Sequence, residues 1–266
     1  MSKVISFSSG KGGVGKTTLV ANLGHLWAKR GARTLLVDGD WTLGKLGIAL
    51  GARPKWTVES ALSGRVSLAQ AICPVSENLD LLASPSGLIG FEEMNAGQRT
   101  QLFYELESVG SNYDVVLMDH SSGVDWGVIQ FAAAAHQHVI VTTTEPTSYM
   151  DAYAIMKILS KRFKVNEFWL VVTMSPNGSG TAQRIHRFTE FVRNQLMVRV
   201  HLLETFQLEP KLSESIRIQK PFVEQFPDAV LTARLEALSL KLEAARGQVS
   251  SGLRYFYSQK SSLLAR

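Results

Sequence analysis

Seven short runs rich in β-branched residues and leucine recur along the chain, and we expect each of them to form a strand. They are VISF (4–7), TLLVD (34–38), LDLLA (79–83), DVVLMD (114–119), HVIVTTT (138–144), FWLVVT (168–173) and VRVHLL (198–203). Apolar residues fill these runs without alternation, which is typical of parallel strands that are buried on both faces.

Segments with the apolar spacing of helices lie between most of these runs. They are 17–30, 98–108, 150–162, 182–196 and 229–245. Strands that alternate with helices predict an α/β fold, in which a mostly parallel central sheet is covered by helices on both faces.

The composition favours one large domain. The 266 residues contain no linker rich in Pro, Gly or Ser, and a hydrophobic content of 45% is enough for a sizeable core. The one cysteine, Cys73, has no internal disulfide partner, and the first residues lack the apolar run of a signal peptide. No run reaches the roughly 20 apolar residues of a membrane span. We therefore expect a cytoplasmic protein whose membrane contact, if any, is peripheral.

The positive charge is concentrated at the end of the chain. The net charge is +5, and four of the five excess charges follow Ala244, where there is no Asp or Glu. We therefore expect a main domain over 1–246 and a basic, aromatic tail over 247–266. If the tail is helical, one side of it carries Leu253, Phe256, Tyr257 and Leu264 beside basic residues. That composition suits a helix in a membrane interface, and the alternatives are a helix docked on its own domain or a disordered end.

The stretch SSGKGGVGKTTL (8–19) fits the phosphate-binding pattern G-x-x-x-x-G-K-[ST], directly after a predicted strand and opening a predicted helix. Its glycines let backbone N–H groups face the phosphates, aided by the N-terminus of the helix. We expect Lys16 to bridge the β- and γ-phosphates and the Thr17 hydroxyl to bind Mg²⁺. The residues expected to contact the nucleotide are Gly10, Gly12, Gly13, Val14, Gly15, Lys16, Thr17 and Thr18.

A second lysine, Lys11, occupies the second position of the loop, where its side chain should project away from its own nucleotide. A cation there reaches a phosphate only across an interface, unless it is a solvated surface lysine. The pattern KGGVGKTT resembles the deviant phosphate loop of the MinD/ParA family, and the resemblance covers nearly the whole chain. It implies a P-loop ATPase that uses ATP and Mg²⁺ and forms a homodimer when ATP is bound. In that dimer the catalytic Lys11 reaches the nucleotide of the partner subunit.

The stretch LLVDGDWTLGKLGIALG (35–51) resembles the first switch of that family. The resemblance places Asp38 at the magnesium site and makes Asp40 catalytic, since a carboxylate can orient or deprotonate the attacking water. The alternative is a structural role at a strand end or helix cap. Relatives usually carry Asn and Asp five and seven residues after the catalytic aspartate, whereas this chain has Lys45 and Gly47. These departures imply slow hydrolysis or an unusual partner.

The stretch DVVLMDHSSGV (114–124) resembles the strand and second switch of the same family. The resemblance implies that Asp119 holds Mg²⁺ through water and that Gly123 senses the γ-phosphate. As with Asp40, a structural role for Asp119 is the alternative.

Two further stretches indicate the branch of the family. TTTEPTSYMDAYAIMKIL (142–159) and SESIRIQKPFVEQFP (213–227) resemble the FlhG type, the flagellar-number regulators, more than the chromosome-partition ATPases. The adenine side of the expected pocket differs from relatives that have Pro where this chain has Gln207. Thr173 and Gln207 could hydrogen-bond the base, and Met174 could pack on it.

Several aromatic and imidazole side chains lie near the predicted switches. Trp41 and Trp126 each follow a switch, and they suit a dimer interface and a hydrophobic core equally well. His136 and His138 have no acidic or cysteine partner nearby in the sequence, so we do not expect a zinc site. His120, next to the second-switch aspartate, would couple pH to the switch only weakly.

The resemblance implies an ATPase that dimerises on Mg·ATP and separates after hydrolysis, with control of flagellar number or placement as its output. Three alternatives stay open: a septum-placement ATPase, a chromosome- or plasmid-partition ATPase, and an adaptor that hardly hydrolyses ATP. The expected partner is a protein of the flagellar or other polar machinery, with possible membrane contact through the tail. DNA binding is less favoured because the chain outside the tail is nearly neutral.

Overall fold

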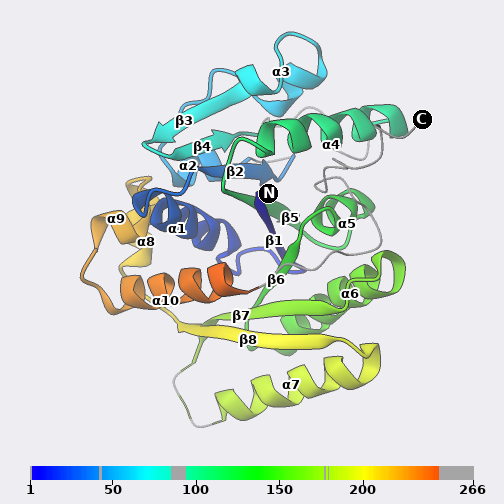
Figure 1. Ribbon diagram of the computed structural model, residues 1–266. Helices are drawn as coiled ribbons and strands as arrows, with labels where there is room; N and C mark the ends of the chain where they lie inside the picture. The colour runs from blue at the N-terminus through cyan, green and yellow to red at the C-terminus, as the bar shows by residue number, and fades with distance from the viewer. Residues whose placement is uncertain (1, 42–43, 85–93, 177, 179, 246–266) are drawn as a thin grey trace.

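The computed structural model shows one eight-stranded sheet between two layers of helices (Figure 1). The structure describes residues 2–41, 44–84, 94–176, 178 and 180–245. The strand order is β3-β4-β2-β5-β1-β6-β7-β8. The strands are β1 Lys3–Ser9, β2 Thr34–Gly39, β3 Ile72–Ser76, β4 Leu79–Leu82, β5 Val115–Ser122, β6 Gln137–Thr142, β7 Glu167–Ser175 and β8 Arg199–Gln207. All neighbours pair in parallel except β3 and β4, so the predicted α/β fold is confirmed.

Helices cover both faces of this sheet. They are α1 Lys16–Lys29, α2 Leu46–Ala49, α3 Val58–Leu62, α4 Ala96–Gly110, α5 Trp126–Ala133, α6 Pro146–Phe163, α7 Thr181–Leu196, α8 Leu212–Arg217, α9 Phe222–Gln225 and α10 Val230–Ala244, with a short 3₁₀ turn at Ala69–Ala71. One hydrophobic cluster joins α1 and α10 to one face of the sheet. Two others join α4, α5, α6 and α7 to the opposite face (Figure 1).

The seven predicted strands and five predicted helices are all confirmed, and the elements missing from the prediction have physical reasons. Strand β3 is an antiparallel edge strand that is only half-buried and contains Pro74, which an edge tolerates because the ring has no N–H to donate. Helix α5 has the sequence WGVIQFAA, which is almost wholly apolar and therefore shows no helical period. Helices α2, α3, α8 and α9 are too short to give a periodic signal.

The carboxyl ends of β1, β2 and β5 lie side by side, and the predicted site residues lie together at this edge of the sheet. The phosphate loop follows β1, and the register aligns Asp38 of β2 directly with Asp119 of β5. In an open parallel sheet, ligands bind outside this edge.

The end of α10 is fastened at the opposite edge of the sheet. Lys3 Nζ, at the start of β1, donates hydrogen bonds to the carbonyl oxygens of Leu242 at 2.7 Å, Glu243 at 2.5 Å and Ala245 at 2.9 Å. A cation on the last carbonyls of a helix complements the helix dipole. The predicted tail, 247–266, lies outside the described residues. Among those described, no helix combines the length and apolar character needed to cross a membrane.

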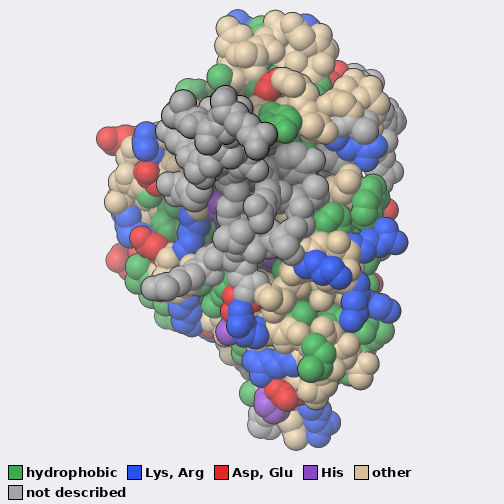
Figure 2. Space-filling model, turned by 45° about the vertical axis from the view of Figure 1, so that its right-hand side comes forward, with side chains coloured by type: hydrophobic (Ala, Val, Ile, Leu, Met, Phe, Trp, Pro, Cys, Tyr) green, Lys and Arg blue, Asp and Glu red, His purple; other side chains and the backbone are tan. Residues whose placement is uncertain are grey.

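Basic side chains are unevenly distributed over the surface. Figure 2 shows Lys and Arg side chains over the lower half of one face, where α6 and α7 lie. Those two helices contribute Lys157, Lys161, Arg162, Arg184, Arg187 and Arg193, against the acidic Asp151 and Glu190. The net charge of the chain outside the tail is therefore close to zero although this face is locally basic.

Candidate functional site

Glycines shape the loop between β1 and α1. Gly13 and Gly15 have left-handed backbones, with φ of 77° and 82°, a conformation that costs glycine little because it has no Cβ. Gly10 is required for another reason, because a Cβ there would lie 2.9 Å from the backbone carbonyl carbon of Asp151 and 3.0 Å from its Cα. The loop therefore passes directly against the first turns of α6, a contact that the sequence pattern did not reveal.

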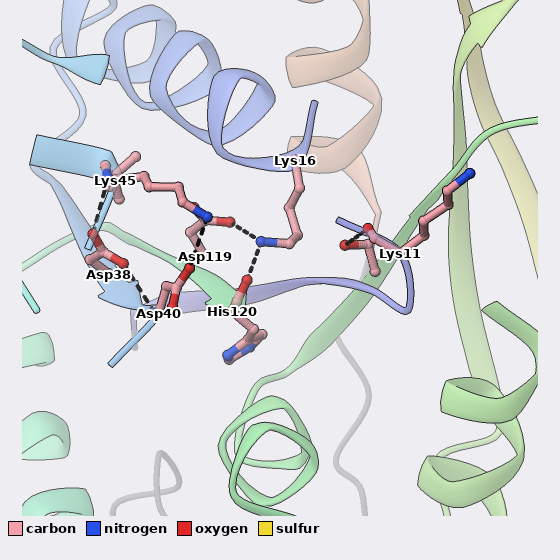
Figure 3. Close-up of polar contacts among 9 residues, drawn as sticks. Lys11, Lys16, Asp38, Asp40, Lys45, Asp119 and His120 are labelled. Atoms are coloured by element: carbon pink, nitrogen blue, oxygen red, sulfur yellow. Dashed lines mark hydrogen bonds and ion pairs between the residues drawn. The ribbon is translucent and has the colours of Figure 1, made fainter. Parts of the chain in front are cut away.

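Lys16 forms a buried ion pair with the second-switch aspartate. Its ammonium lies 2.6 Å from Asp119 Oδ1 and also donates to the carbonyl oxygen of His120. The side chains of Lys16 and Asp119 are 8% and 2% exposed, so each charge depends on the other for compensation. Figure 3 shows Lys16 reaching from the start of α1 to the end of β5.

Asp38 is a second buried carboxylate beside this pair. It accepts hydrogen bonds from the backbone N–H groups of Asp40 and Leu46, both at 3.0 Å. Burial, and then repulsion from Asp119, raise the pKa of Asp38 to about 7. Two buried carboxylates on adjacent strand ends form an environment that favours a cation.

Asp40 and Lys45 form a more exposed pair at the mouth of the site. Lys45 Nζ lies 3.4 Å from Asp40 Oδ2, and the two side chains are 60% and 15% exposed (Figure 3). Lys45, which stands where relatives usually carry Asn, thus contacts the Asp40 carboxylate, which the family resemblance makes catalytic.

Two adjoining pockets open along the phosphate loop. The first is lined by the loop backbone together with Lys16, Thr17, Asp40 and Lys45. The second is apolar and is lined by side chains that include Leu19, Phe206, Leu231 and Leu235. They share Val14, Gly15, Thr18, Met174 and Leu212. A polar pocket that continues into an apolar one suits a ligand with a charged end and a flat apolar end.

The three residues predicted to contact the base, Thr173, Met174 and Gln207, all line the apolar pocket, but their side chains differ in what they contact. The Thr173 hydroxyl donates to the carbonyl oxygens of Val14 at 2.7 Å and Thr142 at 3.2 Å, so in this structure it fastens the phosphate loop to β6 and β7. Met174, with a left-handed backbone and 43% exposure, and the exposed Gln207 leave their side chains available to a ligand.

Lys11 points away from its own phosphate loop. Figure 3 shows its side chain running in the direction opposite to that of Lys16. Its ammonium forms an ion pair with Glu145, which immediately precedes α6, and the two side chains are 42% and 58% exposed. The geometry agrees with the predicted direction of this side chain, while the partner Glu145 was not predicted.

Known proteins match this architecture over most of the chain. The sequence pattern of the AAA domain family matches residues 2–167, more than half of the chain. Antiactivator FleN of Pseudomonas aeruginosa is 26% identical over 91% of this chain and 86% of its own length. Flagellum site-determining protein YlxH of Helicobacter pylori is 27% identical over 97% of this chain and 89% of its own. The MinC:MinD cell division complex of Aquifex aeolicus contains a chain with a TM-score of 0.72, 26% identity and coverage of 94% of this chain and 100% of that one.

This chain belongs to the MinD/ParA family of P-loop ATPases. It is therefore an ATPase, and ATP with Mg²⁺ is its substrate and metal. Members of this family dimerise and bind partner proteins, and the matched MinD chain is in complex with MinC.

The site of this MinD/ParA ATPase fits those groups. The loop backbone and Lys16 would hold the triphosphate, while Thr17, Asp38 and Asp119 would hold Mg²⁺, which prefers oxygen ligands. The metal supplies charge neutralisation during phosphoryl transfer. To hold a triphosphate, Lys16 would exchange the Asp119 carboxylate for phosphate oxygens, which would leave Asp119 to the metal. Asp40, at the rim of the same pocket, would be placed to accept a hydrogen bond or a proton from the attacking water.

The second switch of this MinD/ParA ATPase is fastened to β1. The Gly123 N–H donates to the carbonyl oxygen of Ser9 at 3.0 Å, so it would have to leave that bond to contact a γ-phosphate. His120 is fully buried against Phe131, with ring centroids 5.5 Å apart. Burial, and then the nearby Lys16 charge, hold the pKa of His120 well below its usual range, so the ring is neutral at physiological pH.

The structure separates the two tryptophans that followed the switches. Trp41 is 7% exposed and packs edge to face on Phe131, which makes it a core residue. Trp126 is 43% exposed and lies between the Arg162 guanidinium at 5.1 Å and the Phe163 ring at 5.6 Å. Trp126 therefore stays a candidate for an interface.

The paired histidines are part of the core. His136 Nδ1 accepts a hydrogen bond from Val4 N–H at 3.1 Å, and His138 Nδ1 lies 3.3 Å from Ser6 Oγ. Both rings are buried. Within the described part of the chain, no group of three or more His, Cys, Asp or Glu residues has the arrangement of a metal site.

Sequence reasoning missed the part of the pockets that α8 provides. Leu212 and Ile216 line the phosphate pocket, and Leu212 also lines the apolar one. Ile216 belongs to the stretch 213–227 that marked the family branch, but no pattern in the sequence places that stretch beside the nucleotide.

The raised pKa of Asp38 predicts a pH dependence of stability. Its ordinary pKa is 3.8 and its folded value is about 7, so the folded chain binds this proton more tightly than the unfolded chain. The resulting stabilisation is full below the unfolded pKa and is lost as the pH rises through about 7. Replacing Asp38 with Asn removes it. We expect the free energy of unfolding of the parent, relative to Asp38→Asn, to fall by about 2 to 3 kcal/mol between roughly pH 5 and 8. Urea unfolding of both proteins without Mg²⁺, at several pH values, measures this difference. If the free energies of unfolding of the parent and of Asp38→Asn changed with pH in the same way, the prediction would be wrong.

Proposed function

We propose that this chain is an ATP-driven switch in which two subunits pair face to face on Mg·ATP and separate after hydrolysis. Lys11 of each subunit completes the triphosphate site of the other. The observation that carries the proposal is the direction of Lys11, which leaves its own loop for the surface, where it forms an exposed ion pair with Glu145. An exposed pair contributes about 1 kcal/mol or less, so the lysine is readily transferred to a stronger anion.

The proposed cycle follows from the difference between the two nucleotides. ATP carries a γ-phosphate for Lys11 of the partner subunit to contact, whereas ADP does not. The triphosphate therefore adds interface contacts that are lost on hydrolysis, and nucleotide state shifts the population between dimer and monomer.

We infer that the output of the switch is control of flagellar number or placement. Two relatives that align with nearly the whole chain support this output: FleN, named an antiactivator, and YlxH, named a flagellum site-determining protein. Septum placement is the alternative, because putative and named septum site-determining MinD proteins align with about 60% of the chain at 30–37% identity. The partner would be a protein of the corresponding polar or division machinery.

The proposal also assigns a separate role to each of two parts of the chain. Residues 1–246 would form the ATPase domain, and the tail, 247–266, would provide peripheral membrane contact at the inner face of the cell membrane, placing the protein in the cytoplasm. The tail's basic and aromatic composition supports this reading.

The proposal is tested by measuring mass with size-exclusion chromatography and light scattering. We expect a monomer with Mg·ADP, a dimer with Mg²⁺ and a non-hydrolysable ATP analogue, and a monomer under both conditions for Lys11→Ala. Nucleotide binding by Lys11→Ala should persist, because Lys16 and the loop backbone remain. A parent chain that never pairs, or a Lys11→Ala variant that pairs as the parent does, would refute the face-to-face switch.

Two further binding experiments distinguish the membrane-tail proposal from a partition ATPase. Anionic vesicles that retain the full chain but not a chain ending at residue 246 would support the membrane tail. Salt-sensitive, sequence-independent DNA binding that appears only with ATP would instead favour a partition ATPase using the basic face over α6 and α7.

A further inference from the structure

Three lysines of the site are each paired with a carboxylate. Lys11 pairs with Glu145, Lys16 with Asp119 and Lys45 with Asp40. The first two belong to the family's phosphate loop, whereas the third comes from the position at which this chain departs from its relatives. Lys45 therefore adds a positive charge to the nucleotide site that the family pattern does not require.

Lys45 belongs to the same pocket as the phosphate loop. It immediately precedes α2, at the N-cap position, and its side chain lines the polar pocket together with Lys16, Thr17 and Asp40. At 60% exposure its ammonium is free to swing on a four-carbon stem, while the Asp40 side chain, at 15%, is held closer to the protein.

We propose that Lys45 is a third phosphate-binding lysine, which exchanges the Asp40 carboxylate for the γ-phosphate when ATP binds. The proposal deepens the ATPase function described above and depends on it for the presence of ATP. No covalent step is involved; one ion pair is replaced by another.

The balance of charges favours this exchange. The Lys45–Asp40 contact is long, at 3.4 Å, and half-exposed, so it contributes at most about 1 kcal/mol. A triphosphate brings several negative charges into the same pocket, and a hydrogen bond from an ammonium to a charged oxygen is stronger than one between neutral groups. Lys45 therefore gains more from the phosphate than it loses at Asp40.

The exchange would link Asp40 to the identity of the nucleotide. With ADP there is no γ-phosphate, so the ammonium stays on Asp40 and competes with a water molecule for that carboxylate. With ATP the ammonium leaves and no longer competes with the attacking water for the Asp40 carboxylate. Lys45 would thus favour ATP over ADP and would stop competing for the catalytic carboxylate only when there is a phosphate to transfer.

Binding measurements test this directly. Titration calorimetry with Mg²⁺ and either ADP or a non-hydrolysable ATP analogue is carried out on Lys45→Met and its parent, both carrying Lys11→Ala so that subunit pairing adds nothing. We expect Lys45→Met to bind the analogue about tenfold more weakly and ADP within about twofold of the parent, as for the loss of one charge-assisted hydrogen bond. Asp40→Asn should show the opposite shift, with tighter binding of the analogue, because the ammonium no longer has a competing carboxylate.

The matched control is Lys55→Met. Lys55 is a lysine whose ammonium lies 5.3 Å from the ring centroid of Trp56 and which does not line the phosphate pocket. Its replacement removes the same charge and should change neither affinity by more than about twofold. Melting temperatures of all variants without nucleotide show whether each remains folded.

Two results would overturn the proposal. Equal weakening of analogue and ADP binding would mean that Lys45 attracts anions in general, and unchanged binding of both nucleotides would mean that Lys45 does not contact the γ-phosphate. Light scattering on matched samples that keep Lys11 reports subunit pairing separately, so failure of the Lys11 switch is distinguishable from failure of the Lys45 exchange.

Discussion

Asp40→Asn should lower ATP turnover by about a hundredfold or more without weakening ATP binding. The amide keeps the shape of the side chain but cannot accept a proton from the attacking water. Asp40 lies at the rim of the pocket that holds Lys16 and Thr17, so it is placed to act on the phosphate end of the nucleotide. Steady-state release of phosphate, with binding of a non-hydrolysable analogue measured in parallel, separates the chemical step from affinity.

The control for this prediction is Asp114→Asn. Asp114 pairs with Arg33 at the opposite end of the strands, where the same change of charge has no route to the nucleotide. We expect its turnover to match the parent. Turnover by Asp40→Asn at the rate of the parent would show that another group activates the water, and undetectable turnover by the parent itself would favour the adaptor reading.

Gly10→Ala should destabilise the protein without nucleotide by about 2 to 4 kcal/mol and abolish nucleotide binding. The new Cβ would be 2.9 Å from the carbonyl carbon and 3.0 Å from the Cα of Asp151, and backbone atoms inside α6 cannot move aside as a flexible side chain can. Either the loop or the helix must shift, and the loop forms much of the lining of the phosphate pocket. Urea unfolding gives the stability, and calorimetric titration with Mg·ADP gives the binding.

Gly12→Ala is the matched substitution within the same loop. Its Cβ would meet Ser122 Oγ at 3.5 Å, an ordinary contact, and Gly12 is not among the glycines with a left-handed backbone. We expect its free energy of unfolding to change by about 1 kcal/mol or less. Equal losses of stability in the two variants would point to a general intolerance of side chains in the loop rather than to the contact with α6.

The paired charges explain why this site needs both of its ligands. Lys16 and Asp119 neutralise each other in the buried interior, and Asp38 lies beside them with a raised pKa. Removing one partner leaves an uncompensated buried charge, whereas nucleotide and metal together replace both. Triphosphate and Mg²⁺ are therefore expected to bind in a coupled manner.

The sequence alone determined the α/β class, seven of the eight strands and the location of the phosphate loop. Those features are local: buried parallel strands are continuous apolar runs, and a phosphate loop is a fixed spacing of glycines before a lysine. Order along the chain also placed Asp38 and Asp119 at strand ends, which is why they were expected near the metal. The edge strand β3 and helix α5 escaped because neither has a periodic pattern.

The tertiary structure alone decided which charged groups meet and which aromatic residues are buried. Lys11 and Glu145 are separated by 134 residues and Lys16 and Asp119 by 103, and these partners depend on the strand order and on how α6 packs beside β1. Trp41 joined the core through Phe131, whereas Trp126 stayed at the surface, although the sequence favoured neither outcome. Side-chain partners across a fold result from register and packing between distant segments, and a pattern read along one segment does not contain them.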